Sequence, residues 1–134
     1  MSLSRPTSTE WKWGDTFLHD RDRWEHLQVV LSDPAVNPSK IVFVNFSSQP
    51  YHERTCVIEP GEHPYVKKQT YIPYQFAYVL PLAYLEEAES SGRLRKQAPL
   101  SSTLLQRAIF GASRSRRMAT EIWDIIEGQD LLPI

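Results

Sequence analysis

The sequence predicts a mainly β domain of the α+β class, in which a small β-barrel is followed by C-terminal α-helices. The chain has 134 residues, 41% of them hydrophobic and 23% charged, which is the composition of an ordinary globular domain with one core. Ten prolines against five glycines exclude long helices from the middle of the chain. Apolar residues at helical spacing occur near the C-terminal end. We therefore expect a flexible tail at residues 1–10 and a single domain at residues 11–134.

Four strands are predicted in the first part of the domain. They lie within residues 11–18, 26–32, 41–47 and 55–59. The first is interrupted or entered by a turn at Gly14-Asp15, and the second is partly alternating and rich in β-branched residues. The third is apolar almost without a break until Asn45, so we expect it to be an interior strand that is buried on both faces.

The segment after the Pro60-Gly61 turn is expected to be less regular. His63–Val66 and Thr70–Tyr74 are aromatic and interrupted by proline, which suits edge strands better than central ones. Residues 75–80 continue as a further strand or a bend, and residues 81–89 are predicted to form a short helix.

The helical appendage is expected at about residues 101–128. Ser101 or Ser102 can cap a first amphipathic helix, for which Gly111 is a natural C-terminal stop. Ser113 can then cap a second helix that ends near Gly128.

Cysteine content and hydropathy point to a cytoplasmic address. Cys56 is the single cysteine, so no internal disulfide is possible, and no apolar run approaches the roughly 20 residues that span a bilayer. No signal-peptide pattern is visible. We expect no association with a membrane.

A basic stretch near the C-terminal end is the most distinctive charge feature. The net charge is only −1, yet residues 93–117 hold seven cations and no acidic residue. These cations are Arg93, Arg95, Lys96, Arg107, Arg114, Arg116 and Arg117. Such a stretch can attract the phosphates of single-stranded RNA, although a solvated helical surface that nearby carboxylates balance is the more usual reason for it.

Three segments resemble the PemK/MazF-like endoribonuclease toxins and their variant relatives. They are Gly14-Asp15, the strand Leu27–Ser32 and the strand Ile41–Ser48. In that family a G-D opening precedes a strand of the type R-P-A-L-V-L-S, and a strand ending in T-S or S-S follows. The resemblance covers roughly residues 11–80. It implies an SH3-like β-barrel with appended helices, RNA cleavage without a metal or other cofactor, and a protein partner such as an antitoxin.

The chain also departs from the family pattern. His26 stands where the toxins place a phosphate-gripping arginine, and Leu27 replaces the proline that follows it. The first loop is shorter than usual. Ser47 stands where threonine is common, which preserves the hydroxyl group.

Four residues are candidates for catalysis. Metal-free cleavage of RNA needs a base for the 2′-OH proton, an acid for the leaving oxygen, and donors for the charge on the phosphate. His26 and Ser47 can supply such groups. Glu62 and His63 lie between two prolines in a Pro-Gly-Glu-His-Pro stretch that variant family members share, and Glu62 can orient His63 as an acid or base. The same stretch can instead be a tight turn whose histidine is structural.

Two other functions remain open on the sequence. His52, Cys56 and His63 could ligate a metal, but their spacing matches no known finger, and Cys56 on a strand is better explained as a buried thiol. Alternatively, the chain is a noncatalytic interaction module or a homodimer, with Trp123 and Ile126 as interface anchors. Nucleotide-binding loops, hydrolase elbows and zincin motifs are missing from the sequence, so those classes have no support.

Overall fold

The fold of the protein, taken from a computed structural model that describes residues 10–20 and 25–131, is of the α+β class. A five-stranded antiparallel sheet has the order β6-β3-β2-β1-β7, and β4 and β5 form a second, two-stranded sheet. The strands are β1 (Thr16–His19), β2 (Gln28–Val30), β3 (Ile41–Asn45), β4 (Val57–Ile58), β5 (Thr70–Tyr71), β6 (Tyr78–Leu80) and β7 (Leu94–Gln97). The helices are α1 (Leu82–Ser90), α2 (Ser102–Arg114) and α3 (Thr120–Glu127), with a 3-10 turn η2 (Tyr74–Phe76).

Strand β3 lies inside the larger sheet and is covered on both faces, as its apolar run predicts. Successive side chains of a strand point to opposite faces. Ile41 and Phe43 belong to one hydrophobic cluster and Val42 and Val44 to another, and all four are fully buried. The continuous apolar sequence therefore reflects a sheet that separates two cores.

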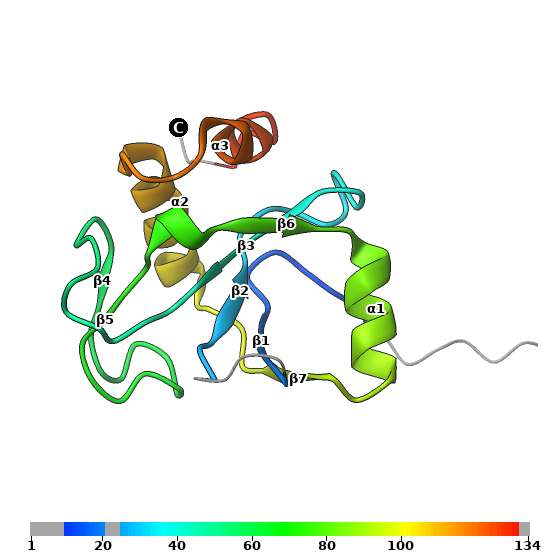
Figure 1. Ribbon diagram of the computed structural model, residues 1–134, viewed down its shortest axis with the longest axis horizontal. Helices are drawn as coiled ribbons and strands as arrows, with labels where there is room; N and C mark the ends of the chain where they lie inside the picture. Colours follow the sequence, from blue (N-terminus) through cyan, green and yellow to red (C-terminus); the bar gives the residue numbers. More distant parts are fainter. Residues whose placement is uncertain (1–9, 21–24, 132–134) are drawn as a thin grey trace, which may run out of the picture.

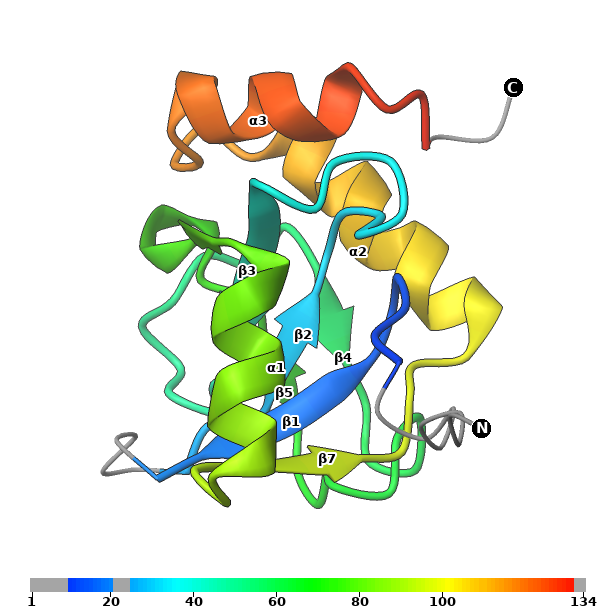
Figure 2. The same ribbon diagram turned by 90° about the vertical axis from the view of Figure 1, so that its right-hand side faces the viewer.

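The helices cover the two faces of this sheet unequally. α1 packs on one face, where Leu85 and Ala88 join Phe43, whereas α2 and the β4–β5 sheet lie on the other side (Figure 1). Figure 2 shows α1 in front of the sheet and α3 at the end of the molecule, across α2. Because α1 is short, it covers only part of its face.

The strands of the described residues do not close a barrel. The larger sheet has β6 and β7 as its two edges, and the smaller sheet joins it through an isolated bridge between Ser47 and Tyr71. The predicted α+β class with C-terminal helices is thus confirmed, and the β structure is an open sheet with a small second sheet beside it.

Two boundaries of the helical appendage differ from the prediction. α2 continues through Gly111 to Arg114, because the small residue gives room to the side chain of Tyr74 instead of ending the helix. α3 starts at Thr120 with Ala119 as its N-cap, well after Ser113, and ends before Gly128 as expected.

One further segment was predicted incorrectly, and one strand lies where none was expected. His63–Val66 forms turns and bends instead of an edge strand. Residues 94–97, taken from the sequence as part of a basic surface, form the edge strand β7 along β1. The tail expected at residues 1–10 lies outside the described residues except for Glu10. None of the helices within the described ranges has the length and apolar run that a bilayer crossing requires.

Candidate nucleic-acid site

A polar pocket opens where the larger sheet extends beyond α1. By the alternation of the strands, Gln28 of β2 and Asn45 of β3 face the same side as the residues under α1, and they pair across the two strands. Tyr78 of β6 completes the floor, and its hydroxyl donates a hydrogen bond to Gln28 Oε1 over 2.8 Å. The sequence places polar side chains at this end of the strands because no helix covers them.

The walls of this pocket combine two imidazoles with aromatic and hydroxyl groups. We call it the histidine pocket, and its volume is about 640 Å³. Its lining residues are His26, Gln28, Asn45, Ser47, Ser48, Gln49, Tyr51, His52, Phe76 and Tyr78. The strands fix the floor, and the loop after β3 together with η2 forms the rim.

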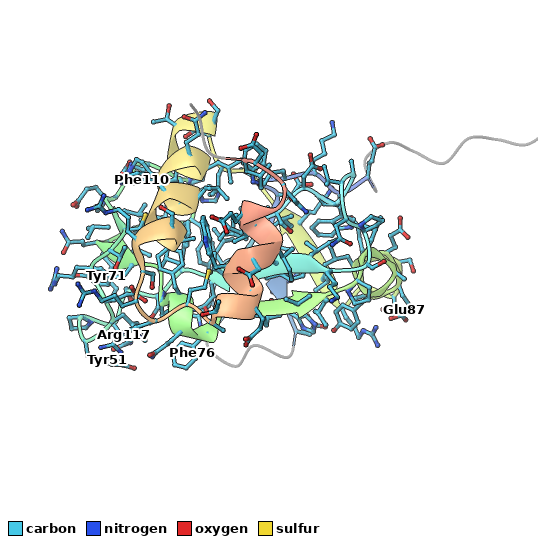
Figure 3. The ribbon with its side chains drawn as sticks, turned by 90° about the horizontal axis from the view of Figure 1, so that it is seen from above. Tyr51, Tyr71, Phe76, Glu87, Phe110 and Arg117 are labelled. Carbon is cyan, nitrogen blue, oxygen red and sulfur yellow. The ribbon has the colours of Figure 1, made fainter. Side chains whose placement is uncertain are left out.

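An aromatic rim surrounds His52. The ring centroids of Tyr51 and His52 are 4.6 Å apart, and those of His52 and Phe76 are 6.1 Å apart in an edge-to-face arrangement. Tyr51 is 77% exposed and Phe76 is 56% exposed, so both rings have faces open to a ligand. Figure 3 shows Tyr51 and Phe76 at the same end of the molecule, with Arg117 beside them.

The electrostatic surroundings of His52 favour its neutral form. Burial lowers the pKa of His52, the positive charges of His26 and Arg117 lower it further, and only Glu53 acts in the opposite direction. A neutral imidazole near neutral pH can accept a proton. His26 and His52 line the same pocket, and the charge of His26 is one of the causes that lower the pKa of His52.

A second, smaller hollow adjoins the histidine pocket. We call it the lysine pocket; its volume is about 210 Å³ and it shares His26, Ser47 and Ser48 with its larger neighbour. The other lining residues are Glu25, Phe46, Tyr65, Val66, Lys67, Lys68 and Thr70. Both hollows therefore meet at the two predicted residues His26 and Ser47.

Glu62 and His63, the other two catalytic candidates, line neither hollow. His63 is only 3% exposed, and its Nδ1 accepts a hydrogen bond from the backbone N–H of Tyr65 over 3.0 Å. Its Nε2 therefore carries the proton and donates to the carbonyl oxygen of Ala98 over 2.6 Å. His63 ties the loop before β5 to the segment between β7 and α2, which agrees with the structural interpretation of this turn.

Glu62 interacts with Arg107 and does not orient His63. Its carboxylate pairs with the Arg107 guanidinium and accepts a hydrogen bond from the backbone N–H of Glu59 over 2.7 Å. The bond from Arg107, followed by that from Glu59, lowers the pKa of Glu62. Arg107 also donates to the carbonyl oxygen of Val57 over 2.6 Å, so the pair fastens α2 to β4.

The seven cations of the basic stretch do not form one surface. Arg93 pairs with Glu87 and Arg95 with Glu25, and Lys96 lies 3.3 Å from Asp15. Glu87 lies at the opposite end of the molecule from Arg117 (Figure 3).

On α2 and the loop after it, the remaining cations have different surroundings. Arg107 is engaged by Glu62, and Arg114 lies over the ring of Phe110 at 5.2 Å. Arg116 is exposed. Arg117 donates to Gln75 Oε1 over 3.1 Å, and its charge is one of the causes that lower the pKa of His52 in the histidine pocket.

The proposed interface anchors on α3 face inward. Ile126 is 1% exposed and belongs to the main core, and Trp123 is partly buried against the same cluster. Ile126 is thus a core residue of the chain itself.

The metal alternative receives no support from the described residues. Within them, no three His, Cys, Asp or Glu side chains gather as metal ligands would. Cys56 is buried, and burial raises the pKa of its thiol. This corresponds to the buried thiol that the strand pattern favours.

Several residues that line the two pockets are not singled out by the sequence as catalytic or RNA-binding candidates. In the sequence, His52 stands out only as a possible metal ligand, and the pair Lys67-Lys68 is a weaker charge feature than the basic stretch at residues 93–117. Tyr51-His52 lies in the loop a few residues after β3 and Ser47, so the available clue in the sequence is its proximity to that strand. No protein-family model matches the chain, and a search of curated proteins found no match either.

Proposed function

We propose that the protein is a metal-independent endoribonuclease that binds single-stranded RNA in the histidine pocket. The observation that carries this proposal is the presence of two imidazoles, His26 and His52, in the lining of one open pocket with aromatic rings at its rim. Unpaired bases stack on exposed aromatic side chains, and amide groups can bond their edges. Tyr51 and Phe76 offer the rings, and Asn45 offers an amide on the floor.

The reaction that this arrangement can perform is transesterification at a phosphodiester. A base removes the proton of the 2′-OH, the 2′-oxygen attacks the adjacent phosphorus, and the bond from phosphorus to the 5′-oxygen breaks. An acid protonates the departing 5′-oxygen, which leaves a 2′,3′-cyclic phosphate and a free 5′-hydroxyl. One proton is taken up and one is given, so the two imidazoles end with exchanged protonation states.

We assign the base to His52 and the acid to His26. His52 is held neutral because burial and two neighbouring cations lower its pKa. A second imidazole near neutral pH can donate the proton. Ser47 lines both hollows although the residue is only 3% exposed, and its hydroxyl oxygen accepts a hydrogen bond from the backbone N–H of Gln49 over 3.4 Å. The hydroxyl proton can therefore be donated to the phosphate.

The same proposal includes kinship with the PemK/MazF-like toxins. An antiparallel sheet joined to a two-stranded sheet through Ser47 and Tyr71 is compatible with an SH3-like barrel that has opened, and helices follow it as in that family. With this kinship, His26 and Ser47 take the positions of the family's phosphate-binding residues. An antitoxin would be the corresponding protein partner.

The proposal is tested by incubating the protein with a pool of single-stranded RNAs of random sequence in the presence of a chelator. We expect fragments that end in 2′,3′-cyclic phosphates. His26→Ala and His52→Ala should each lower the cleavage rate about 100-fold or more.

The matched control is His19→Gln, because His19 bonds to Tyr84 of α1 and does not line the pocket. Thermal unfolding of each variant shows whether it remains folded. A wild-type protein that leaves the RNA pool intact, or folded His26 and His52 variants with full activity, would refute catalysis at this pocket.

A further inference from the structure

The lysine pocket carries an inference that rests on the proposed function and extends it. Its volume of about 210 Å³ is a third of that of the histidine pocket, and its lining contains two lysines, hydroxyl groups and no exposed aromatic ring other than Tyr65. A hollow of this size and chemistry suits a phosphate group better than a base.

The backbone holds the two lysines at this place. Val66 before them is buried, and β5 begins at Thr70, two residues after Lys68. The Thr70 hydroxyl donates to the carbonyl oxygen of Lys68 over 2.8 Å, which fixes the short segment between buried Val66 and the strand. The lysine pair is therefore positioned by the fold, although both side chains are exposed.

One carboxylate, Glu25, also lines this hollow. It lies 3.3 Å from Arg95 of β7 in an ion pair. Arg95 offsets part of this negative charge, so the two lysines leave the hollow cationic on balance.

We propose that the lysine pocket binds the RNA phosphate next to the one that is cleaved. The scissile phosphate would lie where the two pockets meet, at His26 and Ser47. The base of a nucleotide joined by this phosphate would lie in the histidine pocket. The RNA chain continues from there into the lysine pocket, where Lys67 and Lys68 contact the neighbouring phosphate on one side of the scissile one. The protein accordingly recognises a dinucleotide that bears one additional terminal phosphate.

The experiment compares dinucleotides that differ only in the terminal phosphate. The probe is a mixture of all dinucleotide sequences with a 2′-O-methyl group on the first sugar, which prevents cleavage. It is used with no terminal phosphate, with a 5′-phosphate or with a 3′-phosphate, and binding is measured by calorimetry. We expect one of the two phosphorylated forms to bind about tenfold more tightly than the unphosphorylated form. Whether this form carries the 5′- or the 3′-phosphate shows in which direction the RNA chain runs from the histidine pocket to the lysine pocket.

The double variant Lys67→Gln/Lys68→Gln should lose this gain. The matched control is Lys40→Gln, an exposed lysine before β3, at the end of that strand opposite to Asn45 and the pocket. For a longer single strand, each lost phosphate contact should reduce the slope of log Kd against log salt by about 0.7. We expect that reduction in the double variant and an unchanged slope in the control.

The outcomes separate this inference from the proposed function. If all three probes bind with equal affinity, or if the gain in affinity persists in the lysine variant, the lysine pocket does not bind the neighbouring phosphate, while RNA binding in the histidine pocket stands. Inorganic phosphate that binds as tightly as the phosphorylated probe would identify a site for a free anion and overturn it as well. If no dinucleotide or longer RNA binds, the proposed function fails and this inference fails with it.

Discussion

The hydroxyl of Tyr74 occupies the space that a side chain at Gly111 would need. Tyr74 is fully buried beneath α2 and donates a hydrogen bond to the carbonyl oxygen of Ala108 over 2.7 Å. A Cβ atom added to Gly111 would collide with this hydroxyl and would lie 3.2 Å from Cβ of Cys56. The close approach of α2 to η2 and to the chain before β4 thus depends on one glycine inside a helix.

We therefore predict that Gly111→Ala destabilises the protein. Alanine normally stabilises a helix interior relative to glycine by roughly 0.5–1 kcal/mol. Here the added methyl group must displace a buried tyrosine, and overpacking of this kind costs about 1–3 kcal/mol. Urea unfolding should show a net loss of stability of about 1–2 kcal/mol.

The double variant Gly111→Ala/Tyr74→Phe tests the cause. Removing the hydroxyl makes room for the methyl group, so the two changes together should cost less than the sum of the single changes. Strict additivity would show that the Tyr74 hydroxyl does not restrict position 111.

Gly111 also illustrates where prediction from sequence ends. A glycine after an amphipathic run is a usual helix stop, and only the tertiary neighbour Tyr74 shows that this one lies within the helix. β3, in contrast, was predictable because its covered faces leave an apolar run in the sequence. β7 was missed since Arg95, Lys96 and Gln97 give a polar edge strand no apolar signal.

The candidate site was predictable in part, for a similar reason. His26 and Ser47 flank recognisable strands, so their neighbourhood followed from the expected pairing of those strands. His52 lies in a loop, and its closeness to His26 and Arg117 results from tertiary packing. Glu62 and His63 stand out in the sequence because prolines fix their backbone. In the fold, both side chains make structural contacts between loops and neighbouring elements, and neither lines a hollow.

The pH dependence of cleavage should report the surroundings of His52. Since the pKa of His52 lies below the ordinary value of 6.5, the base stays neutral to lower pH than a free histidine does. The acidic side of the rate profile should fall with an apparent pKa below 6.5. Arg117→Gln removes a positive charge and should raise this apparent pKa, whereas Glu53→Gln removes a negative charge and should lower it.

The titration can be followed independently of activity by NMR of the His52 ring. The same directions of change are expected there. If the apparent pKa of the rate profile is the same in both variants as in the wild type, His52 is not the titrating base.

Replacing His63 should affect stability more than chemistry. His63→Ala removes one of two donors to the Ala98 carbonyl oxygen, the Thr16 hydroxyl being the other, and it removes the acceptor of the Tyr65 N–H. The loss of these two hydrogen bonds costs about 1–3 kcal/mol. We expect a loss of unfolding free energy in this range, with the cleavage rate of the folded fraction unchanged. A stable variant with a rate reduced as in His26→Ala would instead place His63 in the chemistry.

Glu62→Gln should weaken the attachment of α2 to β4 and leave RNA cleavage intact. The ion pair with Arg107 is partly exposed, so solvent screening limits the expected loss to about 0.5–1 kcal/mol at neutral pH. Because the pKa of Glu62 is lowered in the folded protein, this contribution is present above the unfolded value of about 4.5 and is lost as the pH falls through the folded value. Wild type and variant should therefore converge in stability in acid, and a constant difference across that range would contradict the assignment.

Trp123→Ser distinguishes a core residue from an interface anchor. Trp123 packs against the main hydrophobic cluster beside Ile126, so its removal should lower the unfolding free energy by about 2 kcal/mol. If the residue serves only the chain's own core, the loss should not depend on protein concentration, and light scattering should give the same mass before and after the change. If Trp123 anchors a second copy, the stability of the wild type rises with concentration and the variant has a lower mass. Thermal unfolding at two concentrations a hundredfold apart, together with light scattering, decides between these outcomes, and we expect the core result because Ile126 on the same helix face is fully buried.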